Sequence, residues 1–304
     1  MNTALPQNIS TLKAWALASR PRTLPAAVAP VVVASAAAIG NHDFVFLPAA
    51  SALLVALLLQ IGVNLANDYF DFKKGIDTAE RQGPVRVTQS GLISPRRVKD
   101  GMMITFILAA PPGMYLMKVG GLPVFIIGIA SILSALAYSG GPFPLASHGL
   151  GDLFVFIFFG LVAVCGTYYV QALYLTPLLI LLGVDVGLLI TAILVVNNLR
   201  DIETDRKAGK RTFAVIIGVR GAKLEYTLLL TGTYILPVAI WLGSFASGWV
   251  LLACLSFPMA FSLNRKIRQT SGGRVLNQTL AQTAKLALVF SVLLAVGLIL
   301  PTLF

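Results

Sequence analysis

The chain has 304 residues, of which 57% are hydrophobic and only 12% are charged, and its mean hydropathy is +0.85. This composition is too apolar for an ordinary soluble domain and predicts an integral membrane protein. The net charge of +11 is spread over polar segments that separate apolar runs, so it favours contact with anionic lipid headgroups and a phosphorylated substrate over nucleic-acid binding.

Apolar runs of helical length recur along the whole chain. A helix needs about 20 apolar residues to cross a hydrocarbon core of roughly 30 Å, because its backbone polar groups must be satisfied within the segment. The runs cover about residues 24–40, 45–66, 102–117, 121–139, 153–172, 176–197, 224–243, 247–263 and 284–303. The first run has no A-x-A-like cleavage site and is expected to be a true span. The sequence therefore predicts an all-α bundle of nine transmembrane helices in one domain, residues 1–304.

The basic residues predict how this bundle is oriented. Cytoplasmic segments retain Lys and Arg during insertion. With a cytoplasmic N-terminus, every Lys and Arg except Lys118 falls on the cytoplasmic side of the nine spans. We therefore expect an external C-terminus and a location in a bacterial-type plasma membrane. The two cysteines, Cys165 and Cys254, lie inside apolar runs, so neither a disulfide framework nor a zinc site is expected.

Two cytoplasmic segments, 67–101 and 198–223, contain more than half of the acidic residues. Around the start of each segment, Asn and Asp side chains recur at spacings of three or four, which place them along one face of a helix. The first group is Asn64, Asn67, Asp68 and Asp71, and the second is Asn197, Asn198, Asp201 and Asp205. Carboxylate and amide oxygens are the hard ligands that Mg²⁺ prefers, so both helix ends are candidate magnesium sites.

Carboxylates crowded at a membrane boundary repel one another unless cations balance them. Mg²⁺ shares its coordination sphere with phosphate oxygens, so such a site suits a diphosphate ligand. The basic residues expected to bind the diphosphate are Lys73, Arg86, Lys210 and Arg211. A simpler interpretation is that each Asp pairs with a neighbouring Lys or Arg at a solvated helix end. The same pattern occurs twice on one side of the membrane, which favours the metal and diphosphate interpretation.

The motifs Asn67–Asp71 (NDYFD) and Asp201–Asp205 (DIETD) resemble those of the UbiA superfamily of intramembrane aromatic prenyltransferases. The superfamily's third Asp of the first motif is replaced here by Gly75, and Asp77 follows two residues later. Within the superfamily, the chain is similar to members that prenylate 1,4-dihydroxy-2-naphthoate, from about residue 14 to Lys285. The segments that carry this similarity are Arg20–Pro25, Asn64–Tyr69, Gly83–Pro84 with Arg86, Gly149–Asp152, Asn197–Asp201 and Gly209–Thr212.

The resemblance implies that the protein transfers a polyprenyl chain from its diphosphate to 1,4-dihydroxy-2-naphthoate, with loss of CO₂ and diphosphate, to give demethylmenaquinone. It also implies a Mg²⁺ cofactor on the cytoplasmic side and no obligatory protein partner. The expected metal ligands are Asn67, Asp68, Asp71, Asp201 and Asp205, and the four aspartates form the catalytic set. The residues expected to contact the aromatic acid are Asn64, Arg22 with its neighbour Arg20, Tyr138 and Asn198.

Other functions stay open at this point. A membrane transporter would place ionisable groups near the bilayer midplane, whereas the acidic clusters here are expected at one face of the membrane. Asp185 interrupts the sixth run and has no assigned role. Among prenyltransferases, 4-hydroxybenzoate is an alternative acceptor and a phytyl group is an alternative donor chain. The sequence determines neither the prenyl chain length nor the oligomeric state.

Overall fold

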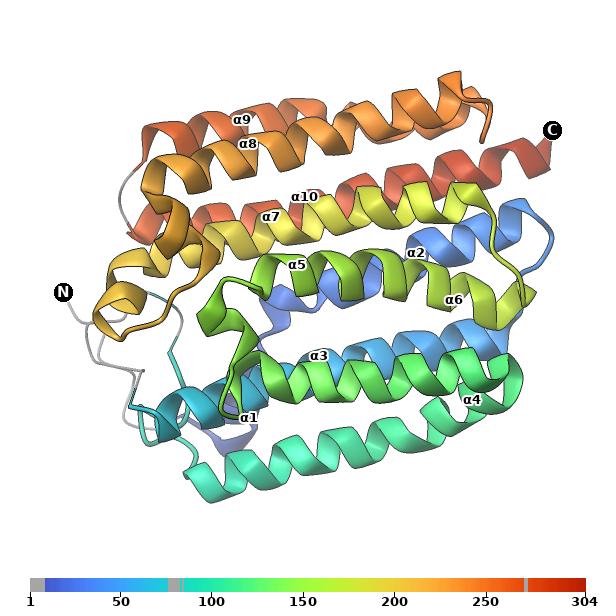
Figure 1. The fold of residues 1–304 in the computed structure, drawn as a ribbon. Helices are drawn as coiled ribbons and strands as arrows, with labels where there is room; N and C mark the ends of the chain where they lie inside the picture. The colour runs from blue at the N-terminus through green and yellow to red at the C-terminus, as the bar shows by residue number, and fades with distance from the viewer. Residues whose placement is uncertain (1–8, 76–82, 84, 271–272) are drawn as a thin grey trace.

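Figure 1 shows the computed structural model of the chain, which describes residues 9–75, 83, 85–270 and 273–304. All regular elements in these ranges are helices, as the apolar runs predict. The α-helices are α1 (Thr11–Ser19), α2 (Pro25–Gly40), α3 (Phe46–Lys73), α4 (Pro95–Ser139), α5 (Gly151–Val155), α6 (Ala163–Ala172), α7 (Pro177–Lys207), α8 (Phe213–Leu242), α9 (Phe257–Gln269) and α10 (Gly273–Ile299). The remaining helical segments are η1 (Pro21–Thr23), η2 (Leu145–His148), η3 (Phe156–Val162), η4 (Gly248–Ser256) and η5 (Leu300–Leu303).

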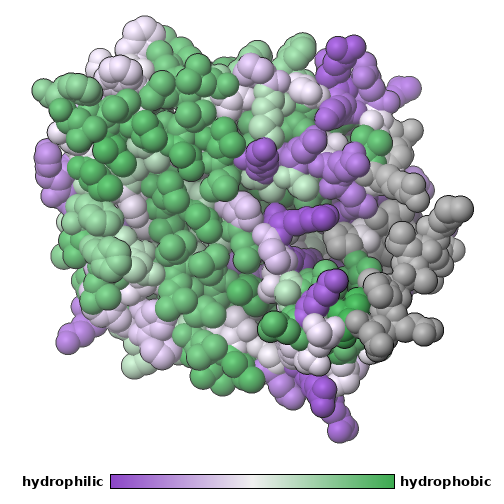
Figure 2. All heavy atoms as spheres, turned by 180° about the vertical axis from the view of Figure 1, so that it is seen from behind, coloured by the Kyte–Doolittle hydropathy of each residue, from purple (hydrophilic) through white to green (hydrophobic). Residues whose placement is uncertain are grey.

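The long helices lie side by side in a bundle, and the C-terminal ends of α3 and α7 are at the same end of it, where α1 packs against α3 (Figure 1). Figure 2 shows apolar side chains covering the middle of the molecule and hydrophilic side chains gathered toward this end. An apolar band of this kind matches the hydrocarbon core of a bilayer. The fold is therefore that of an integral membrane protein whose two Asn/Asp groups lie at one polar end.

Six helices in the described ranges are long and apolar enough to cross a membrane. The count rises to seven if the bent pair Thr11–Thr23 and Pro25–Gly40 forms one span. Each of the nine expected runs lies within helical structure, but neither the number of spans nor their orientation is established by this count. Nine spans with a cytoplasmic N-terminus stay a prediction.

The helix α4 contains 45 residues but reverses direction near Gly121 (Figure 1). Gly121 has φ 68° and ψ −152°, a conformation open to glycine because it has no Cβ. Its two arms correspond to the expected runs 102–117 and 121–139. The second arm ends at Ser139, close to the C-terminal end of α3, and so brings Tyr138 to the polar end of the bundle.

The helix α7 forms the centre of the bundle. In its most apolar stretch of 18 residues, 72% of the residues are buried inside the protein. It packs against α8, α10 and η3. Large buried side chains from the surrounding helices, Tyr168, Tyr226 and Phe290, belong to the same hydrophobic core. This packing fixes the end of α7 that carries the second Asn/Asp group.

The contact between η3 and α7 depends on small residues, as is common where membrane helices pack closely. A Cβ on Gly160 would lie 2.5 Å from the carbonyl oxygen of Gly183 and 2.6 Å from the Cα of Gly187. Both neighbours are backbone atoms of α7, so no side chain can move aside to make room. The seven-residue π-helical segment η3 places Gly160 at this contact.

We expect Gly160→Ala to lower the free energy of unfolding by about 1–3 kcal/mol, the usual cost of overpacking a tight interior contact. Gly166→Ala in α6 is the matched control, because a Cβ there meets nothing within 4 Å. Thermal unfolding of both variants in detergent micelles tests this difference. Equal melting temperatures would show that the η3–α7 contact tolerates a methyl group.

Candidate active site

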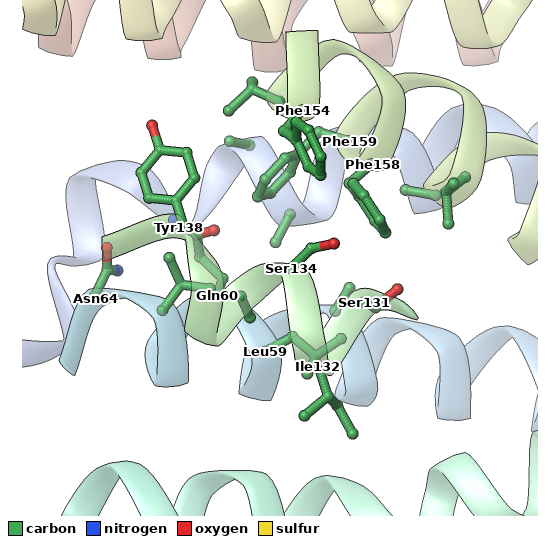
Figure 3. Close-up of a pocket in the computed structure, with 18 of the residues that line it drawn as sticks. Leu59, Gln60, Asn64, Ser131, Ile132, Ser134, Tyr138, Phe154, Phe158 and Phe159 are labelled. Atoms are coloured by element: carbon green, nitrogen blue, oxygen red, sulfur yellow. The ribbon is translucent and has the colours of Figure 1, made fainter. Parts of the chain in front are cut away.

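A cavity of about 580 Å³ lies inside the bundle between α2, α3, α4, α6, α7 and the segment Gly151–Val162. Figure 3 shows Asn64 and Tyr138 at one end of it and the apolar side chains of Ile132 and Phe158 farther along. The cavity is thus polar near the ends of α3 and α7 and mainly apolar in its depth. Such a shape accommodates an amphipathic molecule with a charged head.

Both Asn/Asp groups contribute to the polar end of this one cavity. Asn67 and Asp71 reach it from α3, and Asp201 and Asp205 reach it from the end of α7. Asn64, Asn197 and Asn198 line it as well. The two helix ends that the sequence separates by more than a hundred residues therefore meet at one site.

Asp71 is buried and pairs with two cations that come from outside the helices. Arg86 donates from Nη2 to Oδ2 at 3.0 Å, and Lys210 donates from Nζ to Oδ1 at 3.3 Å. Both cations also line the cavity. Lys74 lies just past the end of α3 and donates to the carbonyl oxygen of Ser139 at 2.8 Å. Partial desolvation lowers the pKa of Lys74 below its usual value; Asp71 opposes this shift, and Lys210 adds to it.

Asp68 lies elsewhere, although it belongs to the same motif. Its side chain is buried at 2% exposure, and it is outside the cavity lining. Its two oxygens accept hydrogen bonds from the backbone N–H groups of Val87 and Thr88, both at 3.1 Å. In this structure, Asp68 therefore faces the segment after α3 and not the cavity.

Asp201 is held by its neighbour Arg200 through two hydrogen bonds. The guanidinium donates from Nε to Oδ1 at 2.8 Å and from Nη2 to Oδ2 at 2.5 Å. Arg200 also donates to Asn197 at 2.8 Å and to Asn277 of α10 at 3.0 Å. Its side chain is only 1% exposed. Arg200 thus links the second Asp motif to the last long helix.

Several residues expected at the site lie outside the cavity lining. Lys73, Arg211 and Arg22 are exposed, whereas Arg20 lines the cavity. Arg20 adopts a left-handed backbone conformation with φ 50°, and the turn that follows it directs the two arginines differently. Asp77 lies outside the described residues.

Asn64 and Tyr138 both line the cavity, but their settings differ. Asn64 donates to the carbonyl oxygen of Ser19 at 3.0 Å and to Thr23 Oγ1 at 3.1 Å, so it supports the turn that carries Arg20. Tyr138 projects from the second arm of α4 (Figure 3). Asn198, the fourth residue expected near the aromatic acid, lies across the cavity on α7.

Sequence reasoning missed two polar residues that belong to this region. Gln60 lies one turn before Asn64, lines the cavity and donates to Thr23 at 3.2 Å. Both residues follow the helical spacing of the Asn/Asp groups, because Gln60 lies four residues before Asn64 and Arg200 lies three residues after Asn197. A search along the same helix faces for other polar side chains would have identified both.

The oxygen atoms at the polar end suit a divalent cation that a ligand helps to hold. Within the described ranges, no three His, Cys, Asp or Glu side chains group closely enough to form an all-protein metal site. Mg²⁺ is usually bound by one or two carboxylates together with substrate phosphates. Asp71 and Asp205, with the amide oxygen of Asn67, fit this mode of binding, whereas the carboxylate of Asp201, which also lines the cavity, is held by Arg200.

The fold and cavity define an integral membrane protein with an internal site for an amphipathic substrate. The chain belongs to the UbiA prenyltransferase family, which matches residues 27–289. It is 38% identical over 300 residues to the 1,4-dihydroxy-2-naphthoate octaprenyltransferase of Escherichia coli, covering 97% of each chain. It is 39% identical to the enzyme of the same name from Mycobacterium tuberculosis, covering 92% of this chain and 95% of that one.

Solved structures share the fold at much lower sequence identity. A UbiA homolog from Aeropyrum pernix aligns with a TM-score of 0.70 at 14% identity and covers 91% of this chain and 98% of that one. A homolog from Archaeoglobus fulgidus bound to GPP and Mg²⁺ aligns with a TM-score of 0.58 at 16% identity, covering 90% and 98%. These matches support the helical architecture described above.

We expect Arg200→Ala to destabilise the protein by about 3–5 kcal/mol, because it breaks a buried ion pair and its links to Asn197 and Asn277. Arg206→Ala is the matched control on the same helix. The Arg206–Glu203 pair is 53% and 69% exposed, and exposed pairs contribute about 0–1 kcal/mol. Melting temperatures of the purified variants measure the difference, and similar values for both would contradict a structural role of the Arg200 network.

Proposed function

We propose that the protein transfers a polyprenyl chain from a polyprenyl diphosphate to 1,4-dihydroxy-2-naphthoate. The observation that carries this proposal is that the Asp-bearing ends of α3 and α7 line one cavity with an apolar interior. The relatives named for naphthoate prenylation support the acceptor, because their similarity extends over nearly the whole chain. The new bond joins the first prenyl carbon to the ring carbon that carries the carboxylate. Diphosphate and CO₂ leave, both ring hydroxyls are retained, and the product is the hydroquinone form, demethylmenaquinol.

The diphosphate group binds at the polar end. Arg86 and Lys210 line the cavity and supply positive charge for its oxygens. Asp71, Asp205 and the amide oxygen of Asn67 would hold Mg²⁺, which would offset the negative charge that grows on the leaving diphosphate. Support for this metal comes from the Archaeoglobus homolog bound to GPP and Mg²⁺.

The prenyl chain occupies the apolar depth of the cavity. Phe154, Phe158 and Phe159 project there from the segment around η3, and Ile132 faces them from α4 (Figure 3). An allylic cation reacts rapidly with water, so a water-poor lining protects the intermediate until the ring attacks. The same lining contributes binding energy in proportion to the apolar area that it buries.

The aromatic acid lies between the diphosphate site and Tyr138. Arg20 lines this part of the cavity, and its guanidinium suits a carboxylate. Asn198 faces the site from α7, and Tyr138 borders it from α4. We therefore assign the carboxylate contact to Arg20 in place of the exposed Arg22.

The active site lies on the cytoplasmic side of a bacterial plasma membrane, in a single domain with nine spans and a cytoplasmic N-terminus. Support for this orientation comes from the basic residues, which concentrate in the polar segments that include the two Asp motifs.

Incubation of membranes that contain the protein with Mg²⁺, a polyprenyl diphosphate and either 1,4-dihydroxy-2-naphthoate or 4-hydroxybenzoate tests the acceptor. We expect mass spectrometry to detect a decarboxylated, prenylated naphthalene product and no prenylated benzoate. Prenylation of 4-hydroxybenzoate alone would refute the naphthoate assignment. Repeating the assay with phytyl diphosphate shows whether the donor site accepts a phytyl chain.

We expect Asp71→Asn and Asp205→Asn each to reduce kcat/KM by at least about 100-fold, because each removes a charged ligand from the diphosphate and metal site. Glu203→Gln is the control, since Glu203 is exposed and pairs with Arg206. Membrane fractionation confirms that every variant is inserted. Retained turnover in either Asp variant would exclude that residue from the site.

A further inference from the structure

We infer that Asp68 is a positioning residue that holds the turn at residues 86–90 and thereby directs Arg86 to Asp71 in the cavity. This inference deepens the proposed function and rests on it for the role of Arg86 in diphosphate binding. It removes Asp68 from the set of metal ligands, although Asp68 belongs to the first Asp motif.

The position of Asp68 on α3 separates it from Asp71. Three residues of an α-helix correspond to a rotation of about 300°, so the two side chains point in directions about 60° apart. Asp71 lines the cavity, whereas Asp68 lies under Val87 and Thr88 at 2% exposure. The two carboxylates of one motif therefore face different neighbours.

The turn that Asp68 contacts is closed by its own backbone. The N–H of Ser90 donates to the carbonyl oxygen of Arg86 at 3.0 Å, and the N–H of Ile93 donates to that of Val87 at 3.1 Å. Neither bond uses the N–H groups of Val87 and Thr88, which donate to the Asp68 carboxylate. Asp68 thus supplies the acceptors that the turn itself lacks.

Burial makes these two hydrogen bonds difficult to exchange for others. Val87 is fully buried in a hydrophobic cluster with Ile93 that includes residues of α1 and α3, and the neighbouring Thr88 is 3% exposed. A buried N–H without an acceptor is costly. If Asp68 rotated toward a cation in the cavity, both N–H groups would lose their acceptor. The Asp68 carboxylate therefore stays hydrogen-bonded to the backbone of the turn.

The consequence is the placement of Arg86. Its backbone begins the turn held by Asp68, and its side chain reaches Asp71 at 3.0 Å with only 6% exposure. Arg86 is thus fixed at two points, through its backbone by Asp68 and through its guanidinium by Asp71. A cation placed in this way is ready to bind the diphosphate without loss of side-chain freedom.

Hydrogen exchange of the purified protein tests the anchor without any substrate. Asp68→Asn keeps the shape of the side chain but replaces one acceptor oxygen with an NH₂ group. We expect amides in residues 85–93 to exchange about tenfold faster in this variant. Asp71→Asn and Arg86→Gln should leave exchange in this segment close to wild type. Unchanged exchange in Asp68→Asn would overturn the inference.

Calorimetric titration with GPP in the presence of Mg²⁺ tests whether Asp68 acts through Arg86. We expect Asp68→Asn and Arg86→Gln each to weaken GPP binding by about tenfold, and the double variant to bind no more weakly than Arg86→Gln alone. Effects that multiply in the double variant would overturn the inference. We expect the Mg²⁺ concentration needed for half-maximal GPP binding to rise in Asp71→Asn but not in Asp68→Asn. A rise in Asp68→Asn would also overturn the inference.

If Asp68→Asn does not fold, Asp68→Glu replaces it in the titration. This variant keeps the negative charge, but its longer side chain displaces the turn, so we still expect a lower affinity for GPP. An unchanged affinity would contradict the inference. Neither measurement involves an aromatic acceptor. A wrong acceptor would therefore leave both results intact. Failure of the wild-type protein to bind either GPP or a longer polyprenyl diphosphate would refute the proposed function and leave the exchange test valid.

Discussion

The structure depends on the balance of buried charge at the polar end of an apolar bundle. A carboxylate removed from water needs a cation or several hydrogen bonds, or the bundle is strongly destabilised. Asp201 obtains this balance from Arg200, the preceding residue of α7. Asp71 obtains it from Arg86 and Lys210, which come from segments beyond α3 and α7. One half of the site is thus built into a helix, and the other half is assembled from the chain around it.

This difference gives the two motifs different structural roles. The Arg200 network joins α7 to α10 through Asn277 and so belongs to the rigid centre of the bundle. The cations that pair with Asp71, Arg86 and Lys210, line the cavity directly. In the proposed function, the diphosphate contacts these cations at the polar end while the prenyl chain occupies the apolar depth. The reversal of α4 at Gly121 and the tight η3–α7 contact shape that depth.

Much of the site followed from spacing alone. Carboxylates and amides three or four residues apart identified both helix ends, and most of these side chains do line the cavity. The exceptions have physical causes. Asp68 has the right spacing but faces a turn whose buried N–H groups need an acceptor. Arg22 and its neighbour Arg20 were expected together near the aromatic acid, but only Arg20 lines the cavity, after a left-handed backbone conformation that spacing does not reveal.

The sequence by itself determined that the chain is helical and membrane-embedded, because apolar runs of this length leave the backbone no other way to satisfy its hydrogen bonds. It also determined that two oxygen-rich helix ends exist, since helical periodicity depends only on local geometry. The tertiary structure alone decided that both ends meet at one cavity and which acidic side chains enter it. These outcomes depend on contacts such as those of Asp71 with Arg86 and Lys210, which join residues far apart in the chain. No local pattern encodes such contacts.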